Sequence, residues 1–216
     1  MKSSLFTING SLAYRLGDVV RGYIRKRETS NYNSYITRYP NTIASKYILA
    51  TQDLTDENKD SNIQVLDSII DDNPVNHACM HIRAHDILSR FSEGEYIYNR
   101  EPSDLFKNFQ PRYLSEYGVI DFLLQNNITT VYLFCASHYN DNNSKLTLQL
   151  IEECVSILRD GGITAQYAEE SHPDVAFTHM CNSKFMIGTQ LGYSYLVCKV
   201  VNYRKRPAFF GDMFLS

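Results

Sequence analysis

The segment from His77 to Asp86 carries residues whose types and order could do chemistry. It reads His77-Ala78-Cys79-Met80-His81-Ile82-Arg83-Ala84-His85-Asp86, an apolar run followed by ionisable residues. A buried parallel strand of an α/β protein has this composition when it delivers polar groups to its carboxyl end, where ligands bind. Alternation along such a strand would place His81, Arg83 and His85 on the same side of the sheet.

Arg83 is the residue of this segment with the most specific chemistry. An arginine at the end of a buried strand has one common use, which is the bidentate binding of a phosphate or a carboxylate. The alternative is that Arg83 and Asp86 form an ion pair with each other at the edge of the sheet. The segment alone does not decide between the two.

The histidines of the same segment allow a different kind of site. Histidine and carboxylate side chains are metal ligands, so a metal-assisted phosphoesterase or hydrolase could be built from them. The residues concerned are His77, His81, His85 and Asp86, with His138 and Asp141 near the end of another strand. The sequence has no H-x-H or H-E-x-x-H pattern, which favours a core or base-contacting histidine over a metal ligand. A non-catalytic module that binds a nucleotide or a glycan is a third alternative.

Composition excludes several classes of protein. The chain has 216 residues, a net charge of −3, 44% hydrophobic residues and 21% charged residues, which is ordinary for a globular protein. The slight acidity argues against a nucleic-acid binder. Five scattered cysteines without C-x-x-C spacing indicate reduced thiols and a cytoplasmic protein. We expect no signal peptide and no membrane span, since no apolar run approaches about 20 residues.

The pattern after residue 73 alternates strands with helices, which predicts a Rossmann-like parallel sheet with flanking helices. Strands are expected around Cys79, at Thr130–Ala136, at 163–168 and at 184–188. Helices are expected at 111–126, 144–159, 173–182 and 193–201. A long polar loop, about 87–110, carries Glu93 and Glu95, and loops of this length are often functional. No G-x-G-x-x-G fingerprint is present.

The first 72 residues are predicted to form a small N-terminal α/β subdomain, with residues 73–216 forming the Rossmann-like domain. A strand at 5–8 ends in a turn at Asn9-Gly10, and a helix follows, which would suit weak anion binding. Tyr47-Ile48-Leu49-Ala50 is a second expected strand, and 63–70 is an expected helix. Asp71-Asp72-Asn73-Pro74 marks the boundary.

Four stretches of the chain resemble the fucosyltransferase superfamily, which groups α1,2-, α1,6- and protein O-fucosyltransferases. His81-Ile82-Arg83-Ala84-His85-Asp86 resembles its H-x-R-R-x-D motif, with Ala84 in place of the second arginine. Residues 174–188 resemble a second block, in which an aspartate begins a helix that a strand follows. Thr189-Gln190-Leu191-Gly192-Tyr193-Ser194 stands where the superfamily has a serine-containing turn. Gly10-Ser11-Leu12-Ala13-Tyr14-Arg15-Leu16 is similar to its G-x-G-N-x-L turn.

This resemblance implies a GT-B-type glycosyltransferase that inverts at the anomeric carbon and needs no metal cofactor. The donor would be GDP-fucose or a related GDP-sugar, and the partner a glycan acceptor. By the resemblance, Arg83 would grip the β-phosphate, His81 and Asp174 would contact the guanosine, and the turn containing Ser194 would bind phosphate. A fixed arginine and a helix N-terminus could stabilise the leaving diphosphate in place of a metal ion.

The expected site has further members that carry less specific signals. Glu93 or Glu95 would be the catalytic base by the same resemblance, and simple loop charge is the alternative for both. The remaining residues expected to bind substrate are Gly10, Asp86, Ser137, Thr189 and Tyr193. The acceptor, the linkage and the donor sugar are not identified by the sequence.

Overall fold

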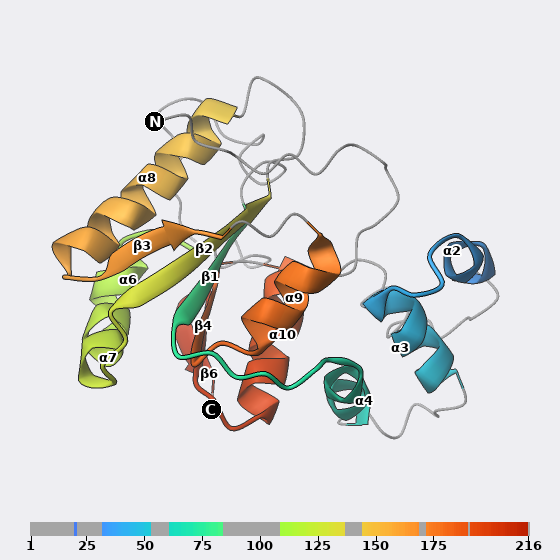
Figure 1. Ribbon diagram of the computed structural model, residues 1–216. Helices are drawn as coiled ribbons and strands as arrows, with labels where there is room; N and C mark the ends of the chain where they lie inside the picture. The colour runs from blue at the N-terminus through green and yellow to red at the C-terminus, as the bar shows by residue number, and fades with distance from the viewer. Residues whose placement is uncertain are drawn as a thin grey trace.

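The computed structural model describes Val20 and residues 32–52, 61–83, 109–136, 144–168, 172–189 and 191–215. Within these residues the chain builds a six-stranded sheet in the order β3-β2-β1-β4-β5-β6 (Figure 1). The first five strands run parallel, and β6 is antiparallel to β5. The strands are β1 (Ala78–Arg83), β2 (Thr130–Ala136), β3 (Thr164–Tyr167), β4 (Phe185–Gly188), β5 (Ala208–Phe210) and β6 (Met213–Leu215). The predicted Rossmann-like α/β sheet is therefore confirmed.

Helices cover both faces of this sheet, as Figure 1 shows. The first face carries α6 (Tyr113–Glu116), α7 (Val119–Gln125) and α8 (Ser144–Asp160). The opposite face carries α9 (Pro173–Cys181) and α10 (Leu191–Tyr203), and beyond them α2 (Asn33–Arg38), α3 (Ile43–Thr51) and α4 (Ser61–Ile69). None of the helices in the described ranges is both long enough and apolar enough to cross a bilayer.

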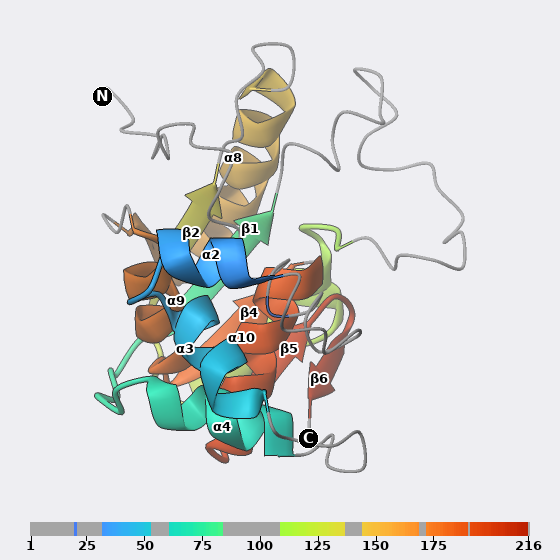
Figure 2. The same cartoon turned by 90° about the vertical axis from the view of Figure 1, so that its right-hand side faces the viewer.

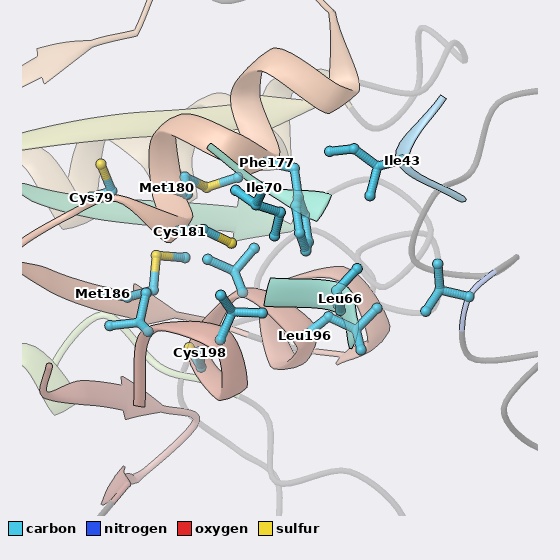
Figure 3. Close-up of a cluster of buried hydrophobic side chains, with 14 of the residues drawn as sticks. Ile43, Leu66, Ile70, Cys79, Phe177, Met180, Cys181, Met186, Leu196 and Cys198 are labelled. Atoms are coloured by element: carbon cyan, nitrogen blue, oxygen red, sulfur yellow. The ribbon is translucent and has the colours of Figure 1, made fainter. Parts of the chain in front are cut away.

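Each face of the sheet has its own hydrophobic core, because side chains alternate along a strand. Met80 and Ile82 of β1 pack in the core beneath α6, α7 and α8, together with Leu123 and Leu158. Cys79 packs in the other core, with residues of α9 and α10. Figure 3 shows this second core, which includes Met180, Met186 and Cys198. His81 contacts Ser194 of α10 on this second face, so the predicted alternation is confirmed for His81 and Ile82.

The helices α3 and α4 belong to the second core. Tyr47 and Leu66 are fully buried in one cluster with Val197 of α10, and Figure 2 shows α3 and α4 beside α10. Arg204, which follows α10, pairs with Asp67 of α4 and donates from NH1 to Asn182 Oδ1 at 2.6 Å. The N-terminal helices therefore pack directly on the Rossmann-like part, and the division at residue 72 stays a prediction.

Two expectations about local structure are wrong. Tyr47-Ile48-Leu49-Ala50 is not a strand but part of α3, whose N-cap Thr42 accepts a hydrogen bond from the Ser45 amide. A four-residue apolar run does not distinguish a strand from a buried helix, and here buried residues recur with helical spacing. The helix expected over 111–126 is interrupted at Gly118, whose φ of +71° separates α6 from α7.

The sequence interpretation also missed the last two strands. The short strands β5 and β6, three residues each, follow α10 and complete one edge of the sheet. The remaining strands and helices lie close to their predicted ranges, and Gly162 ends the turn after α8 with a φ of +79°. The strand predicted at 5–8 and the turn at Gly10 lie outside the described residues.

Candidate functional site

The candidate site lies where the chain changes direction in the sheet. From β1 the chain runs outward to β2 and β3, and it then crosses back to place β4 on the other side of β1. The carboxyl ends of β1 and β4 are neighbours, with His81 paired to Gly188. In open α/β sheets, ligands bind outside the carboxyl ends of the strands at such a reversal.

His81 of β1 is held by side chains from α10. Its Nδ1 lies 2.6 Å from Ser194 Oγ, and its ring lies 5.0 Å from the Tyr193 ring. His81 is only 8% exposed, and Ser194 is fully buried. The hydrogen bond at Nδ1 and the tyrosine ring fix the orientation of the imidazole.

The turn between β4 and α10 fixes the backbone of His81. Thr189 Oγ1 donates to the His81 carbonyl at 2.9 Å, and the Thr189 amide donates to the same oxygen at 3.3 Å. Gly188 has no room for a side chain, because a Cβ there would lie 2.7 Å from Cys198 Sγ and 3.2 Å from Ser194 Cβ. The glycine therefore permits the close approach of α10 that brings Ser194 against His81.

Tyr193 connects this turn to the start of α9. Its hydroxyl donates to the Pro173 carbonyl at 2.7 Å, and its ring meets Phe177 at 5.3 Å. Burial raises the pKa of the Tyr193 hydroxyl well above its usual value, and the nearby Cys181 and Asp174 raise it further. Tyr193 is therefore a neutral hydrogen-bond donor at physiological pH.

Asp174 joins the first turns of two helices. The N-cap of α9 is His172, whose Nδ1 accepts from the Asp174 amide. The Asp174 carboxylate accepts from the Ile43 amide at 3.0 Å, in the first turn of α3. Burial raises the pKa of Asp174 to about 6, although the Ile43 hydrogen bond lowers it.

The structure thus brings together five of the residues expected to bind substrate. They are His81, Thr189, Tyr193, Ser194 and Asp174, connected by the contacts given above. Arg83 ends β1 and pairs with Ala136, so its backbone is at the same edge of the sheet, while its side chain lies outside the description. Residues that lie wholly outside the described ranges are Gly10, His85, Asp86, Glu93, Glu95, Ser137, His138 and Asp141.

His77 and His81, two members of the alternative histidine site, do not lie close enough to be ligands of one ion. The two residues share a face of β1, but four residues of a strand span about 13 Å. His81 contacts Ser194, whereas His77 Nε2 lies 2.8 Å from His179 Nε2, on α9. Alternation predicts which face a side chain occupies and does not predict its neighbours along the strand.

His179 is the residue that the sequence interpretation missed. It lies in the last turn of α9, near His77 and the buried thiol of Cys79. A histidine two residues before a cysteine on a strand was visible in the sequence, but 102 residues separate His77 from His179. Only the packing of α9 on β1 brings the third residue to the pair.

Comparisons with known proteins find a similarity in structure and none in sequence. Neither the known family models nor the curated proteins include a match to its sequence. Among solved structures, the crystal structure of the apo form of POFUT1, a protein O-fucosyltransferase, is similar with a TM-score of 0.38 and 12% identity. The match covers 70% of this chain and 45% of that one, so this chain matches less than half of that protein. The Rossmann-like fold stands on the strand order described above.

Proposed function

We propose that this protein is a glycosyltransferase that binds a GDP-sugar at the carboxyl ends of β1 and β4. One observation carries the proposal. Residues that the sequence predicts for donor binding are far apart in the chain, yet His81 contacts both Ser194 and Tyr193, and the Tyr193 hydroxyl donates to the carbonyl of Pro173, which directly precedes Asp174. These residues lie at the reversal of strand order, where α/β folds bind their ligands.

Asp174 and His81 recognise the guanine base in this proposal. Guanine presents an N1–H and an N2 amino group on one edge, and a single carboxylate can accept both. The Asp174 carboxylate also accepts from the Ile43 amide, which holds it in position. A desolvated carboxylate with a raised pKa is also a common feature of functional sites.

Arg83 and the first turn of α10 bind the diphosphate. The guanidinium can form a bidentate contact with phosphate oxygens, and the positive end of a helix attracts negative charge. Ser194 acts by positioning His81, since its buried hydroxyl already contacts Nδ1 of that ring. These groups stabilise the charge that develops on the leaving diphosphate, so the transfer needs no metal ion.

In this proposal the segment between β1 and α6 supplies the catalytic base that activates the acceptor. Glu93 or Glu95 serves as the base that removes a proton from the acceptor hydroxyl, and inversion at the anomeric carbon follows from a single displacement. The acceptor is a glycan. Activity lost in Glu93→Gln or in Glu95→Gln, with GDP affinity retained, identifies the base.

A thermal-shift panel of GDP, UDP, dTDP and their sugars tests the proposal without a known acceptor. A ligand that binds only the folded state raises stability by mass action, by about 2.7 kcal/mol at a concentration of 100 Kd. We expect GDP and GDP-sugars to stabilise the protein most. Stabilisation by UDP or dTDP equal to that by GDP contradicts the donor assignment, and GDP binding without any sugar transfer or donor hydrolysis indicates a non-catalytic module.

A further inference from the structure

A second cluster of reactive side chains lies at the opposite end of β1. It consists of His77, which directly precedes the strand, Cys79 on the strand, and His179 in the last turn of α9. The Nε2 atoms of the two histidines are 2.8 Å apart, and the three ligand atoms all lie within 4.8 Å of one another. Two imidazoles and a thiol thus converge on one point.

Packing holds these three side chains in place. The His77 ring lies 4.2 Å from the Tyr132 ring, and the His179 ring lies 5.3 Å from the Phe134 ring. The His77 carbonyl accepts from the Lys184 amide at 3.0 Å, which ties it to the start of β4. The cluster is therefore anchored through the sheet and through α9.

Burial differs across the cluster in a way that suits a metal site. Cys79 is fully buried, whereas His77 and His179 are half-buried. The thiol therefore lies at the buried side of the cluster, and the two imidazoles lie between it and the solvent. The cluster also lies at the carboxyl end of α9, the negative end of the helix dipole, which favours a cation.

The donor set indicates which ions fit. Nitrogen and sulfur ligands suit zinc and other late transition metals, whereas magnesium and calcium prefer oxygen. We propose that His77, Cys79 and His179 form a binding site for a zinc ion, with water or another donor in the fourth tetrahedral position. Zinc bonds to nitrogen at about 2.0–2.1 Å and to sulfur at about 2.3 Å in tetrahedral geometry. The two Nε2 atoms, which are 2.8 Å apart without the ion, therefore move slightly apart when zinc enters between them.

Binding changes the protonation of the cluster in a defined way. The Cys79 thiol releases its proton to solvent, and the thiolate sulfur bonds to the ion. The hydrogen bond between the two Nε2 atoms is replaced by two zinc bonds, with the imidazole protons on Nδ1. One proton is therefore released for each ion bound near neutral pH.

This site is independent of the proposed donor site. It differs from the histidine cluster considered from the sequence, since it excludes His81 and includes Cys79 and His179. A failure to bind zinc would leave the proposal for GDP binding unchanged, and a failure to bind GDP would leave the zinc site unchanged.

Spectroscopic titration with cobalt(II), which takes the place of zinc, tests the site. Protein treated with a chelator is titrated with cobalt, and zinc affinity is measured by competition with a chromophoric chelator. We expect one ion per chain, tetrahedral d–d bands and a thiolate-to-cobalt charge-transfer band. Calorimetry in buffers of different ionisation enthalpy measures the released proton. Octahedral cobalt without a thiolate band, or no binding, overturns the proposal.

Variants locate the ion. Cys79→Ser, His77→Ala and His179→Ala each remove one ligand and should lower zinc affinity by more than about 100-fold, the upper cost of losing an outer-shell partner. Cys135→Ala is the matched control, because Cys135 is a thiol that packs against the other core. His179→Gln retains hydrogen bonding towards His77 but ligates zinc poorly, so it separates a structural contact from a metal site. Unchanged zinc affinity in folded His179→Gln or Cys79→Ser overturns the proposal.

Discussion

The two ends of β1 present the same residue type in two different environments. At the carboxyl end, His81 is 8% exposed and bonds to the hydroxyl of Ser194. At the amino end, His77 is half-buried and bonds to another imidazole above a buried thiol. Both histidines face the same side of the sheet, but their partners come from different helices, α10 and α9.

The comparison shows that the groups in contact with a histidine determine which chemistry its imidazole can take part in. A hydroxyl at Nδ1 fixes the His81 ring without competing for a metal ion, which suits hydrogen bonding to a ligand. An imidazole and a thiol around His77 supply soft ligand atoms instead. One strand can therefore carry a nucleotide site at one end and a metal site at the other.

The largest expected effect is at the carboxyl end. Arg83→Ala should weaken GDP binding by about 1.5–3 kcal/mol, the range for a hydrogen bond to a charged group. Arg83→Lys should restore part of the loss, because lysine keeps the charge but not the planar fork. Calorimetric titration with GDP measures both variants. A folded Arg83→Ala variant that binds GDP with wild-type affinity removes Arg83 from the site.

The second effect concerns the support of His81. Ser194→Ala removes the partner of Nδ1 and should lower the free energy of unfolding by about 0.5–1.5 kcal/mol, the net value of one hydrogen bond. It should also weaken GDP binding, and zinc affinity should not change. Chemical denaturation and GDP titration measure these quantities.

Thr51→Val is the matched control for Ser194→Ala. Thr51 Oγ1 is buried and donates to the Tyr47 carbonyl at 2.6 Å in α3. This variant should lose similar stability and keep its GDP affinity. If Ser194→Ala and Thr51→Val change GDP affinity equally, Ser194 has no positioning role.

A smaller effect is expected from the charge of Asp174. Its pKa in the folded protein, about 6, is above the usual 3.8, so the stability contributed by the protonated form is lost as pH rises through about 6. Asp174→Asn keeps an acceptor for the Ile43 amide without the desolvated charge. At neutral pH it should therefore stabilise the fold by about 1 kcal/mol, since partial exposure reduces the full value of the shift.

Denaturation of wild type and Asp174→Asn at about pH 4 and about pH 7.5 measures this effect. The variant should be more stable at the higher pH, and the two proteins should converge at the lower one. Asp121→Asn, at an exposed aspartate of α7, is the control. An Asp174→Asn variant that is less stable than wild type at both pH values contradicts the assignment of an unfavourable charge.

The smallest expected effect is none at all. Chelation by EDTA should leave GDP affinity and any sugar transfer unchanged, because the proposed site stabilises the leaving diphosphate with Arg83 and the first turn of α10 and without a metal ion. The same treatment should remove zinc from His77, Cys79 and His179. If EDTA abolishes sugar transfer and manganese or zinc restores it, the transfer depends on a metal ion. That result would contradict the independence of the donor site from the zinc site.

Much of the fold could be predicted because long patterns determine it. The strand Thr130–Ala136 is a continuous apolar run, and the helix Ser144–Asp160 has a long amphipathic pattern. In both segments, local propensity and burial favour the same secondary structure. Strands of three residues, such as β5 and β6, carry too few positions for a period to be visible. The run Tyr47-Ile48-Leu49-Ala50 became a helix because its neighbours extend the helical period.

The site could be predicted only in part. The alternation of side chains along β1 predicted His81 as a site residue. The resemblance to the fucosyltransferase superfamily predicted His81, Ser194 and Asp174. Their partners depend on contacts between distant segments, such as the hydrogen bond between Asp174 and Ile43, 131 residues apart. The approach of His179 to His77 is of the same kind. Such contacts follow from the packing of helices on the sheet, which periodicity does not specify.

The most direct test is a calorimetric titration of GDP and UDP into wild type, His81→Ala and His77→Ala. We expect wild type to bind GDP more tightly than UDP, because uracil offers one donor to a site proposed to accept two. We expect His81→Ala to weaken GDP binding and His77→Ala to keep wild-type affinity. Equal affinity for UDP and GDP, or an equal loss in both variants, would contradict the proposed donor site.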